Sequence, residues 1–188
     1  IDNHIVSSYT ISYWIKITGI NTSYDTILYE DEWDTNCRFS ITRSGATSTL
    51  GAMFMNGAFG LNIANEYVVS DWKHHVFTIE KSGTAIKYTF YKNGVFNSTA
   101  TGGTWYSTAK TSSTGIVIGG GGSGINIIGY LDDFRIYKGT ALTATQIQEL
   151  YNGRVTIYNK IINGSNGYVE QLTGSNLLIG VDGNDVTS

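Results

Sequence analysis

The densest group of side chains that could do chemistry is an acidic stretch at residues 30–34, Glu-Asp-Glu-Trp-Asp. In an extended backbone, Glu30, Glu32 and Asp34 project from one face. Glycoside hydrolysis needs two such acids beside the scissile bond, and the same oxygens suit calcium or the hydroxyls of a sugar. The structural alternative, which we expect here, is a solvated acidic loop. We predict no hydrolase activity at this cluster; sugar release that disappears in Glu30→Gln would contradict this.

A second pair of carboxylates, Asp132 and Asp133, interrupts the alternation of an otherwise strand-like stretch. Oxygen ligands of this kind suit Ca²⁺, the one cofactor that the sequence suggests. The structural alternative is a β-bulge, in which the two acids cap backbone amides and pair with Arg135 or another nearby cation. We expect the bulge, and keep the two acids as the candidate metal ligands.

Histidine and cysteine offer little further chemistry. His74 and His75 are adjacent in a predicted strand, so they point to opposite faces and cannot share a metal ion. Cys37 is the only cysteine, which excludes an intrachain disulfide. We expect it to be a small buried hydrophobic residue.

Aromatic side chains in polar loops are candidates for sugar binding, and the structural alternative is that the aromatic residues fill the core of a sandwich. The chain has 13 Tyr, 7 Phe and 4 Trp, and an aromatic ring can stack on the apolar face of a pyranose. Trp14 and Trp72 lie in or beside predicted strands, and we expect both to pack inside. The ligand candidates at the rim of the fold are Glu30, Glu32, Trp33, Asp34, Trp105 and Tyr106.

Alternation of apolar and polar residues predicts strands along most of the chain. In the stretch 9–17, Ile11, Tyr13, Ile15 and Ile17 fall on one face. Residues 75–98 are predicted to form three antiparallel strands, because Asn93-Gly94 between two alternating runs is a strong hairpin signal. The other predicted strands lie at 25–29, 38–42, 50–55, 115–118 and 125–137.

One helix is predicted at residues 144–152. Thr143 is a good N-cap, and Gln146 three positions later completes a capping box. Ile147, Leu150 and Tyr151 fall on one face at helical spacing, and Gly153 supplies the left-handed residue after the helix. A helix this short is not stable alone, so its apolar face must dock on the sheet.

Several of these stretches resemble the LamG-like jelly-roll family of the concanavalin A-like lectin and glucanase superfamily. The resemblance lies in Gly-Tyr-Leu-Asp-Asp-Phe-Arg-Ile-Tyr at 129–137, Leu-Tyr-Asn-Gly at 150–153, Tyr-Thr-Ile-Ser-Tyr-Trp-Ile-Lys at 9–16 and Trp-Lys-His-His-Val at 72–76. It implies an all-β fold, a jelly-roll sandwich of two antiparallel sheets with one short helix, occupying residues 1–153. It also implies a lectin-like or adhesive role.

Residues 154–188 lie beyond the resemblance and contain strand-like stretches at 155–162, 168–172 and 177–181. They could pair with the sandwich, lie on a partner, or begin another module. We expect an appended β-rich tail that packs on a neighbouring chain or domain. Its deletion is predicted to leave the melting transition of the sandwich unchanged. The apolar residues predicted to act in assembly are Val155, Ile157, Ile161, Leu177 and Ile179.

Composition excludes some partners. The net charge is −3 with no basic stripe, which argues against nucleic acid, and no apolar run reaches the ~20 residues of a membrane helix. The sequence therefore predicts a non-catalytic module that binds a glycan or protein partner within a larger extracellular, cell-surface or virion-surface assembly. The alternatives are a purely structural coat or fibre component and, third, a β-glucan hydrolase.

Overall fold

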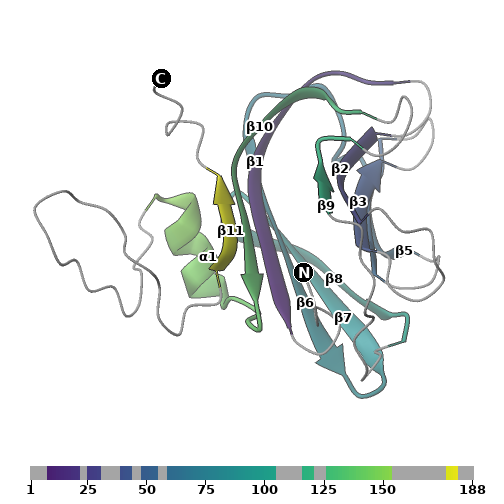
Figure 1. Cartoon of the computed structure of the whole chain (residues 1–188), viewed down its shortest axis with the longest axis vertical. Coiled ribbons are helices and arrows are strands. Elements are labelled where there is room, and N and C mark those ends of the chain that lie inside the picture. Colours follow the sequence, from purple (N-terminus) through teal and green to yellow (C-terminus); the bar gives the residue numbers. More distant parts are fainter. Residues whose placement is uncertain are drawn as a thin grey trace, which may run out of the picture.

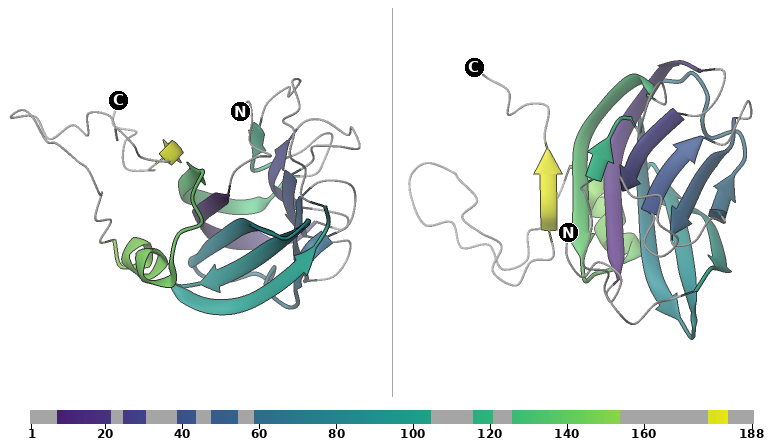
Figure 2. Two further views of the ribbon diagram at one scale, coloured as in Figure 1. Left: turned by 90° about the horizontal axis from the view of Figure 1, so that it is seen from below. Right: turned by 45° about the vertical axis from the view of Figure 1, so that its right-hand side comes forward.

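The computed structural model describes residues 8–21, 25–30, 39–43, 48–54, 59–104, 116–120, 126–153 and 177–181. Two antiparallel sheets face each other across one core (Figure 1; Figure 2). The first sheet has the strand order β11-β10-β1-β6-β7-β8 and the second β5-β4-β3-β2-β9. The predicted class, an all-β jelly-roll sandwich with one short helix, is confirmed.

The elements are β1 (Tyr9–Gly19), β2 (Asp25–Glu30), β3 (Phe39–Arg43), β4 (Leu50–Phe54), β5 (Phe59–Ile63), β6 (Lys73–Ser82), β7 (Ala85–Lys92), β8 (Val95–Gly102), β9 (Ile116–Ile118), β10 (Ile128–Lys138), α1 (Ala144–Tyr151) and β11 (Leu177–Val181).

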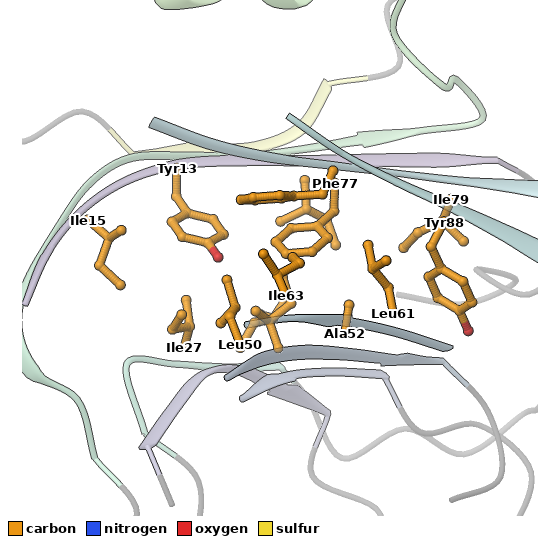
Figure 3. Packing of buried hydrophobic residues seen from close by; sticks show 14 of the residues in the cluster. Tyr13, Ile15, Ile27, Leu50, Ala52, Leu61, Ile63, Phe77, Ile79 and Tyr88 are labelled. Carbon is orange, nitrogen blue, oxygen red and sulfur yellow. The ribbon is translucent and has the colours of Figure 1, made fainter. Parts of the chain in front are cut away.

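The core lies between the two sheets. The predicted inner face of β1 is confirmed, since its four alternating residues from Ile11 to Ile17 are at most 3% exposed. From the six-stranded sheet, Tyr13 and Phe77 point towards Leu50 and Ile63 of the five-stranded sheet (Figure 3). Apolar surface removed from water in this way is the main stabilising term of a sandwich.

The hairpin prediction for residues 75–98 is also confirmed. β6, β7 and β8 form an antiparallel meander. The β7–β8 turn has positive φ angles at Asn93 (50°) and Gly94 (77°), as a two-residue turn of this type requires. β5 was not predicted, although Phe59, Leu61 and Ile63 alternate with two other residues, because those two are Gly60 and Asn62, types that are depleted in strands.

A β-bulge interrupts β10 where the two aspartates lie. Ser12 of β1 faces Arg135 and Trp14 faces Asp132, so Asp133 and Phe134 share one position opposite Tyr13. Asp133 has a φ of 46°, the left-handed conformation of a bulge residue. Its amide donates to Asp132 Oδ1 at 2.8 Å, and Arg135 Nε donates to Asp133 Oδ1 at 2.5 Å. The bulge and the two predicted structural roles are therefore confirmed.

The helix α1 docks on the outer face of the six-stranded sheet. Thr143 and Gln146 form the predicted capping box, and Gly153 has a φ of 67°. Ile147 is fully buried. At the other end of the helix, the Tyr151 ring stacks on Trp14 of β1 at 5.6 Å between centroids.

The tail contributes one described strand. β11 pairs antiparallel with β10, with Phe134 facing Val181 and Ile136 facing Ile179. Residues 177–181 thus extend the sandwich's own sheet, the first of the three alternatives, and not a partner as we expected. The stretches 155–162 and 168–172 lie outside the described residues. The boundary at residue 154 and the role of the tail in assembly stay predictions.

Candidate ligand-binding site

The rim residues predicted from the sequence fall largely outside the described part of the chain. Glu30 ends β2, where its backbone pairs with Ile116 of β9. The remaining ligand candidates, Glu32, Trp33, Asp34, Trp105 and Tyr106, lie outside the described residues, and so does Cys37. Their role as a ligand rim remains a prediction.

The two adjacent histidines point to opposite faces of the six-stranded sheet, as predicted. His75 lies on the inner face, where its Nε2 donates to Glu66 Oε1 at 3.0 Å and its Nδ1 accepts from the Tyr13 hydroxyl at 3.4 Å. Glu66 also forms two ion pairs: Lys92 Nζ lies 2.8 Å from Glu66 Oε2, and Lys73 Nζ lies 3.3 Å from Glu66 Oε1. This inner ion cluster holds the segment before β6 against the sheet.

The inner ion cluster sets the protonation of its members. Burial alone raises the pKa of Glu66, but the hydrogen bonds from His75 and Lys92 outweigh it and lower that pKa to about 2. Burial lowers the pKa of His75, although Glu66 opposes the shift. A neutral imidazole that donates through Nε2 and accepts through Nδ1 satisfies both of its nitrogens. With Glu66 5% exposed and His75 2% exposed, the carboxylate and the imidazole stabilise the fold and offer almost no surface to a ligand.

His74 forms a serine–histidine pair on the outer face, a constellation that could suggest nucleophilic catalysis. Its Nε2 lies 2.8 Å from Ser12 Oγ. Burial lowers the pKa of His74 to about 4. Within the described residues its Nδ1 has no hydrogen-bond partner, so no carboxylate orients the ring as in a catalytic triad. Ser12 and His74 are each 1% exposed, and Tyr151 lies over the His74 ring at 6.0 Å. The pair is therefore a packing contact under α1.

An open groove of about 360 Å³ lies on the outer face, between the segment 141–143 and strands β6, β7 and β8. Its floor consists of side chains that face each other across neighbouring strands. Thr78, Thr89 and Thr99 form one such row, because Thr78 pairs with Thr89 and Thr89 with Thr99. The other residues lining the groove are Glu80, Lys87, Tyr91, Phe96, Ala141, Leu142 and Thr143.

An aromatic pair and a charged pair lie on either side of the threonine row. Phe96 of β8 is 55% exposed, and its ring meets Tyr91 of β7 edge to face, with centroids 6.0 Å apart. On the other side, Lys87 Nζ donates to Glu80 Oε2 at 3.4 Å. The groove thus combines an open aromatic ring, hydroxyl groups and one cation–anion pair, which is the mixture found in sites for small polar ligands.

The wall of the groove is fixed to its floor through Thr10 of β1. The Thr10 hydroxyl donates to the carbonyl of Thr140 at 2.9 Å and accepts from the amide of Leu142 at 2.9 Å. Thr10 itself pairs with Thr78 in the sheet. A groove held by such hydrogen bonds is preformed, which reduces the entropic cost of binding.

The groove can bind but is poorly equipped to catalyse. Its acid is Glu80, which is paired with Lys87, whereas glycoside hydrolysis uses two carboxyl groups. Among the described residues, no group of three His, Cys, Asp or Glu side chains is placed to hold a metal ion. In the same part of the chain, no helix is long and apolar enough to cross a membrane.

Sequence analysis missed this groove, although part of its signal was present. The residues alternating with the buried face of β6 and β7 are Thr78, Glu80, Lys87, Thr89 and Tyr91, so a polar outer face could have been predicted. What the pattern could not give is the strand register that aligns the three threonines, or the path of residues 140–143 beside them.

The fold and the open groove define a lectin-like jelly-roll domain. The chain belongs to the concanavalin A-like lectin/glucanases superfamily, whose sequence profile matches residues 2–148. The family predicted from the sequence is therefore confirmed. No curated protein sequence matches the chain significantly.

Solved structures show the same fold. Domain 4 of the extracellular arabinanase AbnA from Geobacillus stearothermophilus, in complex with arabinotriose, is 25% identical with a TM-score of 0.53, covering 80% of this chain and 69% of that one. The sialidase CBM40 of Ruminococcus gnavus, bound to α2,3-sialyllactose, is 13% identical with a TM-score of 0.57 and coverages of 79% and 84%. The heptameric SAP-like pentraxin of Limulus polyphemus is 20% identical with a TM-score of 0.55 and coverages of 95% and 81%.

Proposed function

We propose that the chain is a non-catalytic carbohydrate-binding module and that its ligand lies in the groove between residues 141–143 and strands β6 to β8. The observation that carries this proposal is the exposed Phe96 ring beside the exposed hydroxyl of Thr99. A sugar can stack an apolar face on the ring while one of its hydroxyls donates to Thr99 Oγ1, whose own proton goes to the carbonyl of Tyr88. The arabinotriose complex of the arabinanase domain supports the ligand class.

Charge indicates which sugars the groove favours. Lys87 and Glu80 neutralise each other, and the whole chain carries a net charge of −3. Neither gives an anionic saccharide an electrostatic advantage. The ligand of the groove is therefore an uncharged oligosaccharide, and a groove of about 360 Å³ has room for a small number of rings.

The setting of the module is part of the same proposal. We place it in a larger extracellular, cell-surface or virion-surface assembly, with the rim residues Glu30, Glu32, Trp33, Asp34, Trp105 and Tyr106 as a second ligand contact. The extracellular arabinanase and the heptameric pentraxin support this setting by analogy of fold. Calcium at Asp132 and Asp133 would have to displace their contacts in the bulge.

Protein binding is a second candidate function, and β11 favours it. This strand pairs with β10 on one side and is the outermost of the described strands in its sheet. An edge strand offers backbone groups to an added strand of a partner chain. The tail residues Val155, Ile157, Ile161, Leu177 and Ile179 remain the proposed assembly element.

Isothermal titration with neutral oligosaccharides, beginning with arabinotriose, tests the groove. We expect saturable binding. Phe96→Ala should weaken the affinity about tenfold, because the variant loses one stacking contact between the sugar and an aromatic ring. Its melting temperature should not change. Thr99→Val keeps the shape, removes the exposed hydroxyl and should also weaken binding. Val95→Ala is the matched control, because Val95 is 62% exposed beside Phe96 but does not line the groove. Binding that is unchanged in both groove variants would refute the location.

A further inference from the structure

A second exposed aromatic surface lies on the same face of the sheet. Trp72, immediately before β6, is 42% exposed, and Tyr130 of β10 is 61% exposed. Their ring centroids are 6.4 Å apart with the planes at 45°. We call this pair, together with Lys16 and Asp71, the aromatic platform. Trp72 was expected inside the core, and that prediction is wrong.

Strand register explains why these rings meet in solvent. Tyr130 pairs with Lys16 of β1, and Lys16 alternates with the inward residues Ile15 and Ile17. Lys73 is the first residue of β6 and pairs with Ile15, which places Trp72 at the end of the same cross-strand row as Lys16. The two rings therefore meet over the strand that carries Lys16. The platform lies beyond the Tyr151 end of α1, which covers the preceding row of Trp14 and His74.

The platform has a polar partner on its rim. Lys16 Nζ lies 3.6 Å from Asp71 Oδ1, with the Lys16 side chain 35% exposed and that of Asp71 fully exposed. An exposed ion pair at this distance contributes little to stability, so a ligand can replace it without a large penalty. A cation that donates beside a carboxylate that accepts suits two neighbouring hydroxyls of one sugar ring.

We propose that the aromatic platform is a second site for a neutral saccharide, independent of the groove of the proposed function. One sugar ring stacks on the indole of Trp72, and its hydroxyls bind Lys16 and Asp71. The charge of the rim sums to zero, so an uncharged ring is the complementary ligand. The four residues of the platform are far fewer than the ~20–30 residues per side of a stable protein interface.

Titration of ¹⁵N-labelled protein with neutral oligosaccharides tests the second site through the indole N–H signal of Trp72, assigned with Trp72→Phe. The probes are arabinotriose, cellotriose and galactotriose, with α2,3-sialyllactose as the acidic comparison. We expect a saturable shift of the Trp72 signal that persists in the groove variant Phe96→Ala. In Trp72→Ala, read from the amide of Tyr130, affinity should fall about tenfold, and Trp72→Phe should keep most of it.

Asp71→Asn decides the chemistry of the ligand. It removes the charged acceptor, so neutral saccharides should bind several-fold more weakly while melting stays unchanged, because Asp71 is fully exposed. Stronger binding in this variant, with α2,3-sialyllactose preferred, would overturn the neutral ligand. A Trp72 signal that no saccharide moves while the groove titrates would overturn the second site alone. A change of sedimentation in Trp72→Ala without sugar would show a contact between copies instead.

Discussion

The inner and outer faces of the six-stranded sheet are built from alternate residues of the same strands but do different work. The inner face packs against the second sheet through the apolar core, and Glu66 and His75 form a buried ion cluster on it. The outer face is covered by α1 over Trp14 and His74. Beside the helix it leaves a groove and a platform open. The inner face therefore serves stability, and the uncovered parts of the outer face are where we propose that recognition takes place.

The largest effect is expected where α1 closes the outer face. Ile147→Asp removes a fully buried side chain and puts a carboxylate in its place. We expect a loss of several kcal/mol, because truncation of a buried Ile alone costs ~2–5 kcal/mol and a buried charge adds to it. Thr145→Asp is the control, since Thr145 is exposed in the first turn of the helix. Equal melting temperatures for the two variants would show that the helix does not depend on the sheet.

Acid should destabilise the protein in two steps, the first from the buried histidines and the second from Glu66. The folded-state pKa of His74 is lowered to about 4, below its unfolded value, so the unfolded chain binds the extra proton and stability falls as the pH drops from ~7 to ~4. The folded-state pKa of Glu66 is lowered to about 2, so its stabilisation is present above ~4.5 and is lost as the pH falls towards 2.

Calorimetry between pH 2.5 and 8 separates these two steps. Glu66→Gln should be less stable than the parent at neutral pH and should lose the step below pH 4.5, while keeping the step that His74 causes. His74→Gln should keep the step below pH 4.5 and reduce the step above it to the part that His75 contributes, because burial lowers the pKa of His75 as well. A melting temperature that stays level or rises between pH 7 and pH 4 contradicts the buried, neutral state of the two histidines.

The smallest change in stability is expected at the edge of the sheet. Deletion of residues 155–188 removes β11, which pairs with β10 along a short stretch. The sequence alone predicted no effect on melting. Because each lost hydrogen bond is worth ~1 kcal/mol, we now expect a folded sandwich that melts a few degrees lower, at roughly 2–4 °C per kcal/mol. Unfolding of the truncated chain would show that the tail belongs to the core.

Much of the fold could be predicted because its signals are local. The alternation of β1, the turn at Asn93-Gly94 and the capping box of Thr143 each lie within a few residues. The bulge at Asp133 was also readable, because two adjacent acids break the alternation. The glycine at position 129 of the family-like stretch is explained by close packing, since a Cβ there would lie 2.1 Å from the carbonyl oxygen of Lys16.

The candidate sites could not be predicted, because they depend on contacts between distant segments. The groove exists where residues 141–143 pass beside Thr78, Thr89 and Thr99, and the platform where Trp72 meets Tyr130 across β1. Trp72 was assigned to the core from its position next to a strand. One residue of register decides whether such a side chain faces the other sheet or solvent.

Chemical-shift mapping with the tightest neutral oligosaccharide tests the central claim, that recognition lies on the uncovered outer face. The account predicts perturbed amides at Thr78, Thr89, Phe96 and Thr99, and none along β3 and β4 of the opposite sheet. Perturbations confined to the rim residues 30–34 and 105–106 or to the five-stranded sheet, with none at the groove, would contradict it.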